Sequence, residues 1–133
     1  MEPGQLIFAR LSQAPSVGGL LQHVRDGQPE VKIYPVQAPE ETPRPYLVYQ
    51  LISRVPDGSA LCELDDVVRV QVSMFADTYA EICTLANALR RQLHRYETAG
   101  AALELANEFD HPKTAGALCF FRSQDYRVEL APD

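Results

Sequence analysis

The densest group of side chains that could do chemistry is formed by Glu108, Asp110 and His111. Carboxylates and imidazoles transfer protons in enzymes and hold divalent metals. Adjacent residues of one segment rarely converge on one ion, however, and here Pro112 follows directly. A strand that runs into a solvated turn explains the same residues without chemistry. A small cytosolic enzyme or ligand-binding module that uses Glu108, Asp110 and His111 is therefore the alternative hypothesis.

Other sequence motifs typical of catalytic or cofactor sites are incomplete in this chain. Ser59 follows Asp57 and Gly58 but lacks the glycine spacing of a nucleophile elbow. Gly18 and Gly19 precede leucines and lack a following lysine, so no phosphate-binding loop is predicted. The three cysteines have no CxxC spacing, which favours neither a disulfide framework nor a zinc site. We therefore predict no catalytic residue, no cofactor and no metal, and we expect an interaction or structural protein rather than an enzyme.

Two charged groups are candidates for contacts with another subunit or partner. Arg90, Arg91 and Arg95 form a basic cluster near the end of a predicted helix, where positive charge also complements the helix dipole. The second group lies in and beside a predicted hairpin loop and is strongly acidic, with four carboxylates and one arginine. Its residues are Arg54, Asp57, Glu63, Asp65 and Asp66.

The charge of the whole chain limits the class of partner. The 133 residues include 12 Lys+Arg and 18 Asp+Glu, a formal net charge of −6. Proteins that read nucleic-acid sequence gain affinity from basic residues that neutralise phosphates, so this class is disfavoured. The longest apolar runs are far shorter than the roughly 20 residues that a membrane span needs. The first residues are not typical of a secretion signal, and we expect a cytosolic protein that binds no membrane.

The N-terminal region is predicted to form two short helices. Apolar residues recur at helical spacing in residues 5–12 and 16–24, and Pro15 separates the two segments. Gly27 and Pro29 are expected to end the second helix, because glycine suits a C-terminal cap and proline cannot continue the helix. A short strand is predicted at residues 31–34.

The middle of the chain is rich in proline, with six of the ten prolines between positions 29 and 56. These prolines exclude a helix, so residues 36–45 are predicted to be a long loop. Residues 46–53 follow as a strand rich in aromatic and β-branched side chains. A turn at residues 56–58 then leads to a strand over residues 67–75, where apolar and polar side chains alternate.

The strongest helix prediction covers residues 78–96. Thr78 and Glu81 form a capping box, an apolar stripe follows at spacings of three and four, and Gly100 is expected to end the helix. Strands are predicted at residues 103–109 and 117–130, the second with a bulge or bend within residues 122–125. The whole chain, residues 1–133, is expected to be one α+β domain. Its mainly antiparallel sheet of four to five strands would pack against one long helix and the short N-terminal helices.

One succession of short motifs is more specific than this architecture. In chain order it consists of VKIYP from residue 31, AP from 38, PYLVYQ from 45 with IS at 52, VQV from 70, FADTYAE from 75 and DYRV from 125. This succession resembles the tail completion, or tail-to-head joining, proteins of long-tailed phages and prophages. The resemblance extends over nearly the whole chain, and its specificity lies in the order and spacing of the motifs.

The resemblance implies a structural protein that terminates the tail. Such proteins form a ring, typically a hexamer, on the head-proximal end of the tail tube, where the ring stops tube growth. The implied partners are further copies of the chain, the tail tube protein, and the head connector or head-completion protein. The implied locations are the host cytoplasm during assembly and the tail of the virion. A generic bacterial α+β adaptor without a phage role is a third hypothesis.

A closed ring requires that one patch of each subunit meet a different patch of the next. We expect the acidic hairpin loop to face one of two surfaces. One is the basic cluster of a neighbouring subunit, around Arg90, Arg91 and Arg95. The other is the channel through which DNA passes, where negative charge would repel phosphates.

Overall fold

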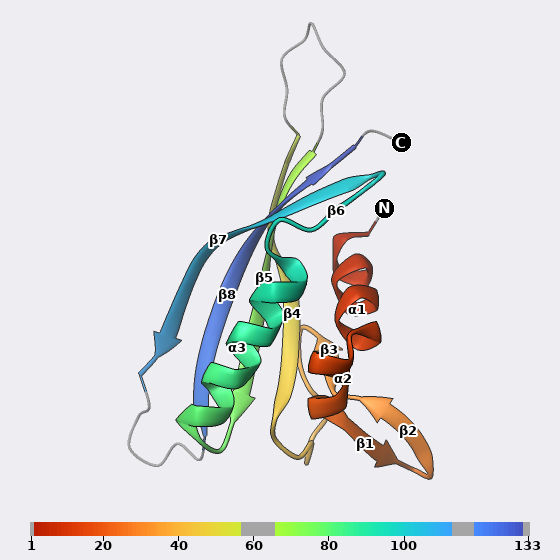
Figure 1. Ribbon diagram of the computed structural model, residues 1–133, viewed down its shortest axis with the longest axis vertical. Coiled ribbons are helices and arrows are strands. Elements are labelled where there is room, and N and C mark those ends of the chain that lie inside the picture. The colour runs from red at the N-terminus through yellow and green to blue at the C-terminus, as the bar shows by residue number, and fades with distance from the viewer. Residues whose placement is uncertain (1, 57–65, 113–118, 132–133) are drawn as a thin grey trace, which may run out of the picture.

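The computed structural model describes residues 2–56, 66–112 and 119–131. Its elements, in chain order, are α1 (Pro3–Gln13), α2 (Pro15–Leu21), β1 (Gln22–Arg25), β2 (Gln28–Val31), β3 (Ile33–Pro35), β4 (Tyr46–Pro56), β5 (Asp66–Ala76), α3 (Tyr79–Leu93), β6 (Glu97–Thr98), β7 (Ala101–His111) and β8 (Phe120–Leu130). The three helices lie on one face of a twisted sheet, and the β1–β2 hairpin projects beside it (Figure 1). This arrangement confirms the predicted α+β class.

The main sheet has more strands than predicted and is mixed, although it is mainly antiparallel, as expected. Its six strands have the order β3-β4-β5-β8-β7-β6, and β3 pairs with β4 in parallel while the other pairs are antiparallel. The expectation of four to five strands missed the edge strand β6, whereas the strand predicted at residues 31–34 overlaps the other edge strand, β3. Strand β6 has only two residues, and it forms by pairing with β7 rather than from a local pattern of its own.

The predicted second helix ends earlier than expected. It stops at Leu21, and residues 22–31, assigned in part to that helix, form the β1–β2 hairpin instead. Asp26 and Gly27 occupy the turn with φ of 52° and 78°. An Asp-Gly pair with positive φ at both positions matches the twist of a tight hairpin, and this turn outweighs the helical spacing of the preceding apolar residues. The strand predicted at residues 31–34 is correspondingly divided between β2 and β3.

The long helix is confirmed at its start and corrected at its end. The Thr78 hydroxyl accepts a hydrogen bond from the Glu81 backbone N–H at 3.2 Å, as the capping box predicts. The helix ends at Leu93 rather than at Tyr96, and Gly100 lies in the later β6–β7 turn. Arg95 has φ of 62°, and its N–H donates to the Leu103 carbonyl. Pairing with β7 therefore draws the chain out of the helix.

The bulge expected near the start of the last strand lies elsewhere. Strand β8 pairs without interruption with β5, whereas the irregularities occur in β7, between Leu105 and Asn107, and in β4, between Leu51 and Ser53. The polar segment of β8 stays extended because Ser123 and Gln124 are buried and hydrogen bonded within the fold.

The hydrophobic core lies between the helices and one face of the sheet. Fully buried aliphatic side chains come from all three helices and from the alternating positions of β5 and β8. They include Ile7, Leu11, Val17, Leu21, Leu85, Leu89, Leu93, Val70, Val72, Met74 and Val128. The first turn of α1 lies close to β4. A side chain at Gly4 would not fit there, since its Cβ would lie 2.7 Å from the Tyr49 ring. No helix within the described ranges is long and apolar enough to span a membrane.

Replacement of a core leucine of α3 tests this packing. Leu89 is completely buried, so we expect Leu89→Ala to lower the free energy of unfolding by about 2–5 kcal/mol, through lost transfer energy and the cavity left behind. Urea denaturation measures this change. Asn87→Ala on the exposed side of the same helix serves as the control and should change it by less than about 0.5 kcal/mol. Equal effects of the two substitutions would contradict the described packing.

Candidate interaction surfaces

The basic cluster predicted from the sequence is divided between two places. Arg90 and Arg91 are exposed in the last turns of α3, where they line a shallow hollow of about 460 Å³ together with Asn87 and His94. Arg95 follows the helix and lines a separate hollow of about 340 Å³, which carboxylates of β6, β7 and β8 also border. Only Arg90 and Arg91 therefore form a joint positive patch.

The acidic group is only partly included in the structure. Asp57, Glu63 and Asp65 lie outside the described residues, and Asp66 is described only as the first residue of β5. Arg54 is exposed on the last part of β4. The proposed contacts of this group therefore stay a prediction.

The three residues of the alternative site do not converge. They lie on β7, where successive side chains point to opposite faces. Glu108 and Asp110 lie on the face that carries the helices, opposite Gln124 and Arg122 of β8. His111 lies on the other face, where its Nε2 is 2.8 Å from the Ser123 hydroxyl. No group of three or more potential metal-ligating side chains occurs among the described residues.

Asp110 belongs instead to an ion-pair network that fastens β7 and β8 to the start of α3. Arg122 Nε donates to Asp110 at 2.6 Å, and the Tyr79 hydroxyl donates to the same carboxylate at 2.8 Å. Glu108 lies 3.9 Å from the Arg122 guanidinium. The hydrogen bond from Arg122 lowers the pKa of Asp110, so this carboxylate is held in its charged form.

A second polar network lies in the core beneath α3. Gln124 Nε2 donates to the Ala86 carbonyl of α3 at 3.0 Å and also to Glu108, while the Tyr126 hydroxyl donates to the Gln124 side-chain oxygen at 2.5 Å. Burial raises the pKa of Tyr126. Because a buried amide is costly unless it is hydrogen bonded, this network determines where α3 lies on β8. The polar run at residues 122–125 of the last strand was its only sequence signal.

The sheet face opposite the helices carries a row of stacked rings that the sequence analysis missed. Tyr46, Phe75, Phe121 and His111 come from β4, β5, β8 and β7 and are direct cross-strand neighbours. Their successive ring centroids lie 4.9, 4.3 and 3.7 Å apart. We call this set the aromatic row. Its members are half-buried, so the row forms a continuous aromatic band across this face of the sheet.

Residues 36–45, the proline loop, are anchored over this face. The Lys32 ammonium, which is buried, donates to the Pro43 carbonyl at 3.1 Å, and Arg25 donates to the Thr42 hydroxyl at 3.1 Å. Arg44 donates to Asp77 at 2.6 Å. The long loop predicted from the prolines is thus confirmed and has a defined shape.

A cavity of about 520 Å³ lies between the proline loop and the open sheet face. We call it the loop cavity. Its floor includes three rings of the aromatic row together with amide and hydroxyl groups of β4 and β5, and its rim carries Glu40 and Glu41. The arrangement offers aromatic surface and negative charge side by side, which suits a protein contact or a cationic group rather than a covalent reaction.

The chain is similar to known proteins in sequence pattern and in fold. The family model described as tail completion protein gp17 matches residues 5–119. No curated protein matches the chain. A chain of the solved structure "Virion of native gene transfer agent (GTA) particle" superposes with a TM-score of 0.73 at 14% sequence identity, and the match covers 98% of this chain and 95% of that chain. The likeness to that structure shows a shared fold.

The Asp110–Arg122 pair predicts a pH dependence of stability. A carboxylate whose pKa is lower in the folded state stabilises the fold above its unfolded pKa, and this contribution is lost as the pH falls through the folded value. We expect Asp110→Asn to be less stable than the wild type at neutral pH, with a difference that shrinks below the ordinary aspartate pKa of 3.8. Urea denaturation at a series of pH values measures it.

Glu97→Gln is the control for this experiment, because Glu97 is exposed and has no ion pair among the residues that the structure describes. Its difference from the wild type should stay small at every pH. A difference for Asp110→Asn that is the same at neutral and acidic pH would contradict the assigned ion pair.

Proposed function

The chain belongs to the tail completion protein gp17 family, and on this premise we propose that it terminates or completes the tail tube and joins the tail to the head. Membership makes it a structural protein of a phage tail. The observation that carries the proposal is the match of the family model over residues 5–119. The proposed role requires contact surfaces rather than an active site, and the charged groups and the loop cavity supply candidates for such surfaces.

The proposed assembly is a ring of identical copies, a hexamer in the assembled tail. One side of the ring binds the tail tube protein, and the other presents a surface to the head connector or head-completion protein. Assembly takes place in the host cytoplasm and leaves the protein in the virion tail. In such a ring each subunit contacts its two neighbours through two different patches. The ring closes because the rotations between successive subunits add up to a full turn.

The outer part of the β4–β5 hairpin is a candidate contact region. Pro56 pairs with Asp66, and both strands continue beyond the helices (Figure 1). Leu51, Ile52 and Val55 on β4 are 52%, 47% and 58% exposed. Neighbouring exposed apolar side chains of this kind mark interaction sites in soluble proteins. We place the acidic hairpin loop, with Asp57, Glu63, Asp65, Asp66 and the adjacent Arg54, in a subunit contact or at the DNA channel.

Loss of the protein should leave growth of the tail tube without a defined end point. We expect phage or prophage particles assembled without this chain to have tubes of variable length and no attached heads, whereas supply of the chain in trans restores uniform, head-bearing tails. Electron microscopy of the two preparations measures tube length and head attachment. Tubes of normal, uniform length with attached heads in the absence of the chain would overturn the proposal.

Charge reversal in the hairpin loop separates its two proposed contacts. If Asp65→Lys combined with Asp66→Lys prevents ring formation, the loop faces a neighbouring subunit. If rings form but DNA passage slows, the loop faces the channel. Light scattering measures the first outcome and DNA retention the second.

A variant with the same change in net charge, Glu97→Lys with Glu104→Lys on the β6–β7 side of the sheet, is the control and should leave both properties unchanged. Unchanged assembly and unchanged DNA retention in the Asp65 and Asp66 variant would exclude both contacts.

A further inference from the structure

We propose that the loop cavity binds the guanidinium groups of Arg90 and Arg91 from a second copy of this chain. The inference rests on the proposed ring and names the two surfaces that would meet in it. The cavity supplies acidic and aromatic groups, and the end of α3 supplies the cations.

The rim of the loop cavity carries negative charge that no described residue neutralises through an ion pair. Glu40 and Glu41 are exposed, and neither forms an ion pair or side-chain hydrogen bond with any residue that the structure describes. Arg44 also lines the cavity, but its guanidinium is paired with Asp77 at 2.6 Å. The rim thus has two carboxylates available for an external cation.

The floor of the cavity suits a guanidinium group in particular. Tyr46 ends the aromatic row, so one face of its ring has no stacking partner within the row, and burial raises the pKa of its hydroxyl. Gln50 and Thr42 add side-chain oxygens to the lining. A guanidinium is planar and weakly hydrated, donates several hydrogen bonds, and stacks on aromatic rings.

The matching cations lie on the opposite face of the same chain. Arg90 and Arg91 are exposed, and no carboxylate among the described residues lies within ion-pair distance of either. The hollow that they line contains only Asn87 and His94 besides. Two adjacent positive side chains that pair with no described carboxylate of their own subunit thus complement the two carboxylates of the cavity rim.

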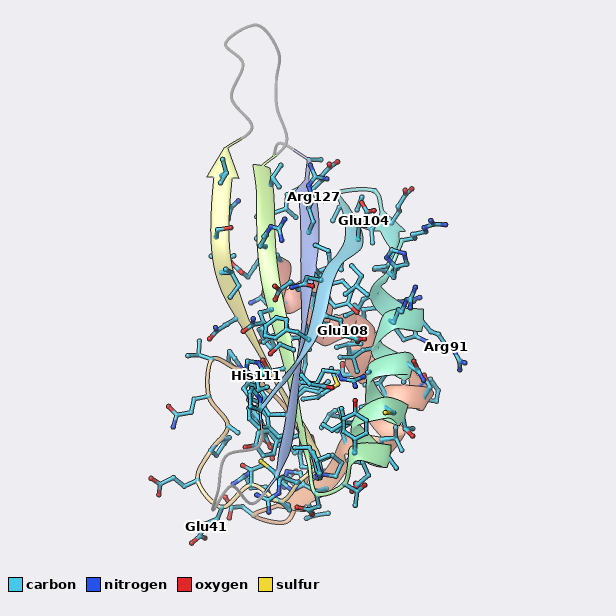
Figure 2. All side chains as sticks on the ribbon, turned by 90° about the vertical axis from the view of Figure 1, so that its left-hand side faces the viewer. Glu41, Arg91, Glu104, Glu108, His111 and Arg127 are labelled. Carbon is cyan, nitrogen blue, oxygen red and sulfur yellow. The ribbon has the colours of Figure 1, made fainter. Side chains whose placement is uncertain are left out.

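The positions of the two patches favour a ring over a two-fold dimer. Glu41 lies on the side of the open sheet face, and Arg91 lies on the far side, beyond α3 (Figure 2). A two-fold dimer would require both patches of each copy to face the same partner. Patches on opposite faces instead join one copy to the next head to tail, which closes into a ring when the rotation between copies permits.

Complementary charge reversal tests the pairing. We expect Glu40→Arg with Glu41→Arg, and separately Arg90→Glu with Arg91→Glu, each to raise the concentration at half-assembly by more than about tenfold, because like charges then meet in the interface. A mixture of the two variants should assemble at wild-type concentrations. The cavity variant then has two positive patches and the α3 variant two negative ones, so copies that alternate around a hexamer pair opposite charges at every contact. Light scattering and negative-stain microscopy, with tail tube protein present, measure assembly.

The control is Glu97→Arg with Glu104→Arg, which has the same charge change as the cavity variant but alters neither proposed patch. Thermal unfolding of each variant establishes that the fold is retained. If the wild type forms rings and either reversal variant assembles equally well, or if the mixture fails to assemble, the cavity assignment is overturned while the ring stands. If the wild type forms no rings even with tail tube protein, the ring itself is overturned.

Discussion

The register of β4, β5, β8 and β7 is the constraint on which both faces of this protein depend. Each strand alternates its side chains between the faces, so a slip by one residue would exchange them. In the observed register Val70, Val72 and Val128 meet the helices, while the aromatic row assembles on the other face. The core and the floor of the loop cavity are thus two consequences of the same strand pairing.

Hydrogen bonds, one of them buried and the others exposed, connect that sheet to α3. Gln124 reaches the Ala86 carbonyl across the interface, and Arg122 joins Asp110 to Tyr79 at the start of the helix. These contacts would be lost if α3 rotated or slid. They therefore hold the buried side of α3 against the sheet and leave Arg90 and Arg91 exposed on its outer side.

The same fold is compatible with very different sequences. The chain from the gene transfer agent particle shares 14% identity and a TM-score of 0.73 with this protein. A structural subunit needs a stable scaffold and matched contact surfaces, and the scaffold depends on burial pattern more than on particular side chains. The candidate contact features of this chain lie on its surface: the anchored proline loop with its acidic rim, the exposed apolar residues of β4, and the arginines of α3.

The sequence by itself determined the α+β class, the Thr78 cap, the long proline loop and the four long strands, because each has a local signal in side-chain period or backbone restriction. The tertiary structure alone decided the edge strand β6, the exit of the chain from α3 before Arg95, and the separation of His111 from Glu108 and Asp110. It also aligned Tyr46, Phe75 and Phe121, residues far apart in the chain. Strand register and long-range hydrogen bonds bring such residues together, and no local pattern encodes which distant strand will supply the partner.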